Sequence, residues 1–234
     1  MISVVIPAYN EERALPTTLR QLLEQAGDYE VIVVDGESSD GTCEVVRQLP
    51  LDRQCAIPSR LTLISARKGR ASQMNAGAKV ARGEWLLFLH ADTVLPVQAL
   101  SRLNALESDL GILAGGFRHQ FSGSDWRLRM ISSLDNFRCI RSRIIYGDQA
   151  LFVRKSLFER LGGFPDQPIL EDVAFCEKLL RVTTPVLLSP PVVTDARKFL
   201  RMGVWRSFVR VLLIILHVEF KFPYLPRGFF QDIR

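Results

Sequence analysis

Cysteine is scarce in this chain and follows no regular spacing. The 234 residues include four cysteines, Cys43, Cys55, Cys139 and Cys176, and no two of them form a Cys-x-x-Cys pair. A disulfide framework or a thiolate metal site normally shows such a pattern. We therefore expect four free thiols, a reducing compartment, and a fold that is stabilised by its hydrophobic core.

The chain also lacks a hydrophobic run long enough to cross a membrane. The segment 204–220 has an uninterrupted apolar core of six residues, 211–216, whereas a spanning helix needs about 20. The first ten residues carry no basic leader and reach Pro7 after a short apolar run, which is not typical of a signal peptide. These absences predict a cytoplasmic protein.

The C-terminal segment leaves two interpretations open. Residues 197–234 hold eight Lys or Arg against two acids, a local excess of +6 in a chain whose net charge is +5. This excess favours an acidic partner, for instance a membrane surface met by an amphipathic helix at 204–220. Alternatively, that helix packs in the core and the charges form a solvated face. Nucleic acid is not expected as a main partner, because the basic residues are not interleaved with aromatic ones on strands.

Short apolar runs alternate with helical patterns through the first part of the chain. Continuous apolar strands that alternate with helices indicate a mostly parallel sheet covered by helices on both faces. After about residue 96 the alternation loosens into short strands, a helix that begins with two acids, and an irregular arginine-rich stretch. The predicted strands are 2–7, 30–35, 60–65, 84–90, 114–117, 150–153 and 184–190, the predicted helices are 11–27, 38–49, 69–83, 171–182 and 204–220, and the arginine-rich stretch is 118–143.

Polar side chains gather where the first four predicted strands end. In an open parallel sheet, ligands bind beyond the carboxyl ends of the strands. The segments that fall there are 7–12, 35–40, 65–70 and 90–92, and three of the four contain carboxylates. One acid at a strand end is usually a helix cap, as Asp40 would be for the helix that follows it. Several acids at one edge of a sheet instead predict a binding site.

Six motifs resemble, in the same order along the chain, those of the family 2 glycosyltransferases with the GT-A fold. They are SVVIPAYNEE, VIVVDGESSDGT, GRASQMNAG, WLLFLHADT, YGDQALFVRKSLFERLGGFPD and ILEDVAFCEKLLR, and together they cover about residues 2–182. The resemblance implies a single α/β domain with a Rossmann-like, mostly parallel central sheet. It further implies a nucleotide-binding half at about 1–95, an acceptor half at 96–195 and a C-terminal helical extension at 196–234.

The resemblance implies that a nucleotide-diphosphate sugar lies across the strand ends. Tyr9 would pack against the base or ribose, and a half-buried packing residue is the less favoured alternative. Asp35 would accept hydrogen bonds from uracil or from guanine, and therefore does not identify the nucleotide. The residues implied in nucleotide-sugar binding are Pro7, Ala8, Tyr9, Glu11, Asp35, Gly69, Arg70, Asn75, Asp148 and Gln149.

His90, Ala91 and Asp92 stand where the family carries its Asp-x-Asp motif, whose acids hold a divalent cation. Along an extended strand, alternation would put His90 and Asp92 on the same side. Mg²⁺ prefers carboxylate oxygens, whereas imidazole suits Mn²⁺ better. Asp92 is therefore the expected main ligand of Mg²⁺ or Mn²⁺. His90 departs from the motif and could be a second ligand, a donor to the sugar, or a histidine with no direct role.

The resemblance also implies a catalytic base in the segment ILEDVAF. Asp172 is the first candidate and Glu171 the second. Two acids at a helix start are also favoured by the helix dipole, which is the structural alternative. The arginines of 118–143 could clamp a diphosphate or a phosphorylated acceptor, or form a mobile basic surface.

The combined prediction is a metal-dependent, inverting glycosyltransferase that moves a sugar from a nucleotide-diphosphate donor to a hydroxyl acceptor of unknown identity. A non-catalytic nucleotide-sugar binding module is the alternative that His90 leaves open, and the Glu171–Asp172 pair argues against it. A nucleotidyltransferase is disfavoured, because the segment PAYNEE is acidic where such an enzyme needs a glycine-rich phosphate loop with a basic residue.

Overall fold

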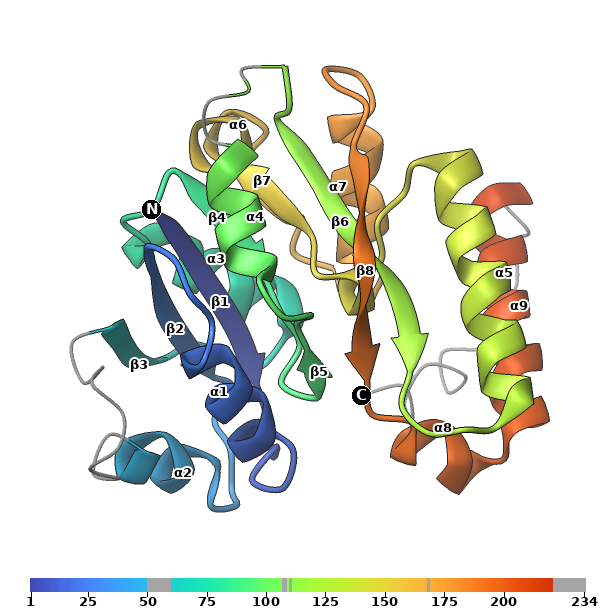
Figure 1. Cartoon of the computed structure of the whole chain (residues 1–234), viewed down its shortest axis with the longest axis horizontal. Helices are drawn as coiled ribbons and strands as arrows, with labels where there is room; N and C mark the ends of the chain where they lie inside the picture. Colours follow the sequence, from blue (N-terminus) through green and yellow to red (C-terminus); the bar gives the residue numbers. More distant parts are fainter. Residues whose placement is uncertain (50–59, 107–108, 110, 168, 221–234) are drawn as a thin grey trace.

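The computed structural model describes residues 1–49, 60–106, 109, 111–167 and 169–220, and its centre is an eight-stranded sheet with helices on both faces (Figure 1). The strand order is β3-β2-β1-β4-β7-β6-β8-β5. The strands are β1 Ile2–Ala8, β2 Tyr29–Asp35, β3 Leu61–Ser65, β4 Trp85–Phe88, β5 Thr93–Val94, β6 Ala114–Phe121, β7 Phe152–Arg154 and β8 Val186–Thr194.

The helices that cover the sheet are mostly short. They are α1 Leu15–Leu23, α2 Thr42–Gln48, α3 Arg70–Val80, α4 Ala99–Ala105, α5 Trp126–Ser142, α6 Lys155–Arg160, α7 Glu171–Leu179, α8 Arg197–Met202 and α9 Val204–Phe220, with a 3₁₀ turn η4 at Gly147–Gln149. The predicted helices at 11–27, 38–49, 69–83, 171–182 and 204–220 thus all occur, in most cases with later starts or earlier ends.

The parallel part of the sheet is β3-β2-β1-β4, as the alternation of runs predicted. All seven residues of β1 are buried, because successive side chains enter two different cores. Ile2, Val4 and Ile6 pack with α1 and α4, whereas Val5 packs with α3. Gly77 lets α3 approach closely, since a Cβ there would stand 2.4 Å from Cγ1 of Val5.

The second part of the sheet is mixed, because β7 runs antiparallel to both β4 and β6. Here one prediction was wrong: much of the arginine-rich stretch is the 17-residue helix α5, and not an irregular loop. Asp125 starts this helix by accepting a hydrogen bond from the Arg127 N–H at 2.9 Å. The helix buries only a few side chains, among them Leu128 and Ile131. Its apolar stripe is therefore too sparse to stand out from the surrounding arginines.

The C-terminal helices α8 and α9 lie beside α5 (Figure 1). Val204 is buried in a small core with Leu128 and Ile131 of α5, so part of α9 packs as a core helix would. Trp205 and Val209, in contrast, are 49% and 51% exposed. None of the helices in the described part of the chain combines the length and the apolar content that crossing a bilayer requires.

Three predicted thiols, Cys43, Cys139 and Cys176, are free cysteines in the structure. Cys55 lies outside the described residues, and so does the basic segment 221–234.

Candidate active site

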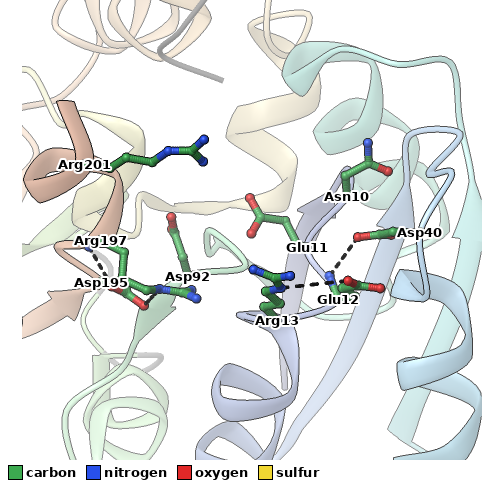
Figure 2. A pocket seen from close by; sticks show the side chains of 9 residues that line it. All are labelled: Asn10, Glu11, Glu12, Arg13, Asp40, Asp92, Asp195, Arg197 and Arg201. Atoms are coloured by element: carbon green, nitrogen blue, oxygen red, sulfur yellow. Dashed lines mark hydrogen bonds and ion pairs between the residues drawn. The ribbon is translucent and has the colours of Figure 1, made fainter.

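The carboxyl ends of β1, β2 and β4 meet at one edge of the sheet, where a hollow of about 520 Å³ opens (Figure 2). Its walls come from the loop after β1, the turn after β4 and the start of α8, which are far apart in sequence. The lining residues are Asn10, Glu11, Glu12, Arg13, Asp40, Asp92, Asp195, Arg197 and Arg201. Five acids and three arginines line this hollow, which is a wall composition suited to a charged ligand.

Asp92 and Glu11 point toward the same space in the hollow, and Arg201 reaches toward it from α8 (Figure 2). The Asp195 N–H donates to the carbonyl of Asp92 at 3.0 Å, which ties the turn after β4 to the start of α8. Asp195 itself forms an ion pair with Arg197. Carboxylate oxygens from separate loops are the donors that Mg²⁺ and Mn²⁺ accept. The residues present therefore fit a divalent cation.

His90 lies on the other side of the turn after β4. β4 ends at Phe88, and the Thr93 N–H donates to the His90 carbonyl at 3.1 Å, so residues 90–93 form a turn. The predicted strand to residue 90 is therefore too long, and the argument from strand alternation does not apply to His90 and Asp92. The His90 ring lies against Gly147, where an added Cβ would stand 2.6 Å from its Nε2.

Asp172 faces the same glycine. The Gly147 N–H donates to its Oδ2 at 2.6 Å, and the Val173 N–H donates to its Oδ1 at 2.8 Å. Asp172 and Glu171 are 7% and 2% exposed, in the first turn of α7. Two backbone donors thus fix the Asp172 carboxylate beside His90. His90 in turn precedes Asp92, the candidate cation ligand, by two residues. An oriented carboxylate in that place can accept a proton from a bound hydroxyl group.

Three predicted donor residues belong to the exit of β1. Pro7 and Ala8 are buried within the strand, and Tyr9 is 37% exposed. The Lys68 ammonium lies 3.8 Å from the centre of the Tyr9 ring. Tyr9 is therefore a surface ring beside a cation and not a core residue. Stacking on a base requires such an accessible ring. Glu11 is half-buried in the hollow described above.

At the end of β2, Asp35 is 5% exposed and its carboxylate accepts hydrogen bonds from the N–H groups of Glu37 and Ser38. It thereby shapes the loop after the strand. At the start of α3, Gly69 has a φ of 138° with open space around its Cβ position, and Arg70 is exposed. A glycine in this conformation leaves backbone accessible to a ligand at the helix start.

The other predicted donor residues make structural contacts. The Asn75 side chain exchanges two hydrogen bonds with the Phe164 backbone, at 2.8 and 3.0 Å, and so joins α3 to the loop before α7. Gln149 is fully buried and its Oε1 accepts from the Tyr146 N–H at 3.0 Å. Asp148 turns toward a buried histidine on β6 instead of the hollow. The roles of these three residues in donor binding stay predictions.

Comparison with known proteins places this chain in a family. A model of the family described as "Glycosyl transferase family 2" matches residues 3–164, which is more than half of the chain. The chain belongs to glycosyl transferase family 2. The predicted family, the fold class and the assignment as a glycosyltransferase are therefore confirmed.

Curated relatives of the transferase are named for several transfer reactions. A Haemophilus influenzae protein called an uncharacterized glycosyltransferase is 24% identical over 82% of this chain and 67% of its own length. An undecaprenyl-phosphate 4-deoxy-4-formamido-L-arabinose transferase of Pseudomonas aeruginosa is 29% identical over 69% of this chain. A poly(ribitol-phosphate) beta-glucosyltransferase of Bacillus spizizenii is 32% identical over 70% of it. The chain covers 49% and 27% of the last two relatives.

Solved structures share the fold. A mannosyltransferase of Pyrobaculum calidifontis, PcManGT, in complex with GDP-Man and Mn²⁺, aligns with a TM-score of 0.67 at 25% identity, over 99% of this chain and 67% of that one. TarS 1–349 of S. aureus aligns with a TM-score of 0.66 at 20% identity, over 92% and 65%. The GT-A neighbours therefore include one that binds Mn²⁺ together with a nucleotide sugar.

Gln73 is a residue of this site that sequence reasoning missed. Its side chain is 3% exposed, and its Nε2 donates to the carbonyls of Ala8 and Val34, each at 2.8 Å. It thereby joins the ends of β1 and β2 at the edge of the sheet that carries the hollow. The available signal was a polar residue inside the motif GRASQMNAG, on the helix face that packs against the sheet.

We predict that Gln73→Leu destabilises the transferase by about 1–3 kcal/mol, because the buried carbonyls of Ala8 and Val34 lose the Gln73 amide, and Ala8 keeps the Gly36 N–H as a donor. Urea unfolding of the native chain and of Gln73→Leu measures this difference in stability. Gln48→Leu is the matched control, since Gln48 is exposed on α2 and contacts only Glu44 among the hydrogen bonds described. Equal unfolding midpoints for Gln73→Leu and Gln48→Leu would show that the bridge between the strands is dispensable.

Proposed function

We propose that the transferase moves a sugar from a nucleotide-diphosphate donor to a hydroxyl acceptor, with inversion at the anomeric carbon and with a divalent cation bound at Asp92. The observation that carries this proposal is the position of Asp172. Its carboxylate is oriented by the Gly147 N–H, and the same glycine contacts His90 of the turn whose Asp92 lines the hollow. The candidate base therefore lies beside the turn that carries the candidate cation ligand. A single displacement needs both groups close to the reacting sugar.

In this mechanism the donor diphosphate lies in the hollow at the ends of β1, β2 and β4. The bound cation would supply charge neutralisation of the departing diphosphate. Arg201 adds a positive charge that faces the same space. Asp172 accepts the proton of the acceptor hydroxyl as that oxygen bonds to the anomeric carbon, and the bond from this carbon to the diphosphate oxygen breaks. One displacement without a covalent intermediate inverts the configuration.

The class of donor rests on the relatives. PcManGT is described with GDP-Man, and TarS 1–349 with UDP-GlcNAc. These two donors differ in base and in sugar, so they support a nucleotide-diphosphate sugar as the ligand class and leave the base to be measured.

Contact with a membrane surface is part of the proposal and rests on α9. This helix exposes Trp205, Val209 and Leu212, and it also carries the exposed Arg206. An apolar face with adjacent arginines is suited to the interface of an anionic membrane. The Pseudomonas aeruginosa relative is named for transfer involving undecaprenyl phosphate, which is a lipid.

Calorimetric titration with UDP, GDP, CDP and ADP, each with and without Mn²⁺, tests the donor site. We expect one nucleotide to bind tightly only with Mn²⁺. We expect Asp92→Asn to weaken that binding at least about tenfold, or about 1.4 kcal/mol, because a charged ligand of the cation is lost. Asp28→Asn is the control, since Asp28 is exposed and precedes β2 at the opposite end of the strand.

Binding that is equal with and without Mn²⁺ in the native chain would remove Asp92 from its role. Metal-dependent binding without any sugar transfer to a panel of acceptors would favour the binding module over the enzyme mechanism.

A further inference from the structure

A second group of metal-ligating side chains lies outside the hollow. It consists of His119 on β6, Asp135 on α5 and Asp148 on η4, and one ligand atom from each lies within 4.8 Å of the others. His119 Nε2 is 3.8 Å from Asp148 Oδ2. The group shares no residue with the hollow that contains Asp92.

The fold holds these side chains on buried surfaces. Alternation along β6 buries His119, which is 2% exposed, between the exposed Arg118 and Gln120. Asn136 of α5 fixes the strand there, because its side chain exchanges two hydrogen bonds with the His119 backbone at 2.8 and 2.9 Å. Asp135 occurs four residues from the buried Ile131 and Cys139, on the packed face of α5.

Polar atoms of this group lack partners. Within the described residues, neither ring nitrogen of His119 has a hydrogen bond, and the same holds for Asp135 Oδ2 and Asp148 Oδ1. Buried side-chain polar atoms are nearly always hydrogen-bonded in native proteins. Three side chains from separate elements each contribute such an atom, and one ligand atom from each lies within 4.8 Å of the others, which indicates a ligand shared by all three.

The charges of the surroundings favour a cation. Arg138 pairs with the other oxygen of Asp135 at 2.8 Å and lies over the Tyr146 ring. The Arg138 guanidinium stands against the carboxylates of Asp135 and Asp148, with that of Asp172 nearby. Burial raises the pKa of Asp148, while His119 opposes this effect. A bound cation would relieve the cost of burying two carboxylates.

We propose that His119, Asp135 and Asp148 bind a divalent transition-metal cation, Zn²⁺ or Mn²⁺, at a site separate from that of the donor cation. One imidazole with two carboxylates is a donor set suited to these ions, whereas Mg²⁺ prefers oxygen ligands alone. The side chains of Asp148 and Asp135 are 35% and 19% exposed, which provides a path for the ion to enter. The ion would join β6, α5 and η4 next to Gly147, whose N–H donates to Asp172.

Titration of the metal-stripped, tag-free full chain with Co²⁺, without nucleotide, tests this site. Co²⁺ bound by nitrogen and oxygen in a protein site absorbs in the visible range, so binding can be followed directly. We expect one Co²⁺ per chain, displaced by Zn²⁺. His119→Leu, which keeps an apolar side chain against Phe121, should weaken binding by more than about 100-fold, since even loss of an outer partner costs about 10–100-fold.

Asp148→Asn is the second variant and should also weaken Co²⁺ binding. It keeps the test valid if His119→Leu does not fold. Asp92→Asn should leave this Co²⁺ site intact. The proposal is overturned if the native chain binds no Co²⁺ without nucleotide, or if both variants bind it as the native chain does. Loss of Co²⁺ binding in Asp92→Asn alone would assign the ion to the donor hollow.

The two proposals can fail separately. If the site at His119 binds no metal, the nucleotide titrations of Asp92→Asn still test the transferase mechanism.

Discussion

Replacing Asp172 with Asn is expected to lower the turnover number of sugar transfer by about 10²–10⁴-fold, the usual contribution of a general base. The amide cannot accept the proton of the acceptor hydroxyl. It can still accept the Gly147 N–H through its oxygen, so residue 172 keeps its contact with η4, which is one of its two backbone hydrogen bonds. Nucleotide affinity should therefore change little, and the loss should fall on turnover.

Steady-state kinetics with the matched donor and acceptor, together with calorimetric titration of the nucleotide, separate these two effects. Asp166→Asn is a suitable control, since Asp166 is exposed and pairs only with the exposed Arg67 among the ion pairs of the described residues. A turnover number of Asp172→Asn within about threefold of the native value, in a folded protein, would remove Asp172 as the base. Glu171→Asp and Glu171→Gln would then be examined as the second candidate.

Trp85→Ala is expected to lower the free energy of unfolding by about 3–5 kcal/mol, as for other large aromatic truncations in protein cores. Trp85 is fully buried, its ring stands edge-on to Phe152 at 5.6 Å, and the Arg154 guanidinium lies 4.3 Å from its ring centre. It is also paired with Ile2 of β1 on one side and Arg154 of β7 on the other. The truncation would leave a cavity where the parallel and mixed parts of the sheet join.

Denaturant unfolding of the native chain and of Trp85→Ala measures this loss. Trp126→Ala is the matched control, because Trp126 is 60% exposed and its ring contact is with the half-exposed Trp205. Its cost should be about 0.5 kcal/mol, as for other surface changes. A loss for Trp85→Ala no larger than for Trp126→Ala would show that this junction does not limit the stability of the fold.

Local pattern was enough to predict the parallel part of the fold. Each of β1, β2 and β4 is a short, mostly apolar run that is buried on both faces, and glycines that act as stop signals, Gly27 and Gly83, follow α1 and α3. These signals lie within about 20 residues, so no distant contact is needed to read them. The mixed part was harder, because β7 has three residues and the face of α5 is largely polar.

Motif resemblance placed Asp92 and Asp172 at a site, but it could not reveal how they are held. Asp172 receives the N–H of Gly147 across 25 residues, and Gln73 reaches Ala8 across 65. Neither partner can be inferred from spacing, since hydrogen bonds between separate elements depend on the angle at which helices cross the sheet. The turn at residues 90–93 likewise overrode the strand pattern that had aligned His90 with Asp92.

By itself the sequence determined the family, the parallel strands and the acids that gather at their ends, because apolar periodicity and short motifs are local properties of the chain. Only the tertiary structure decided that His90 lies against Gly147, that Gln73 joins two strands, and that His119 meets Asp135 and Asp148. These contacts arise when β6, α5 and η4 pack together. Packing brings together side chains that no regular spacing in the sequence connects.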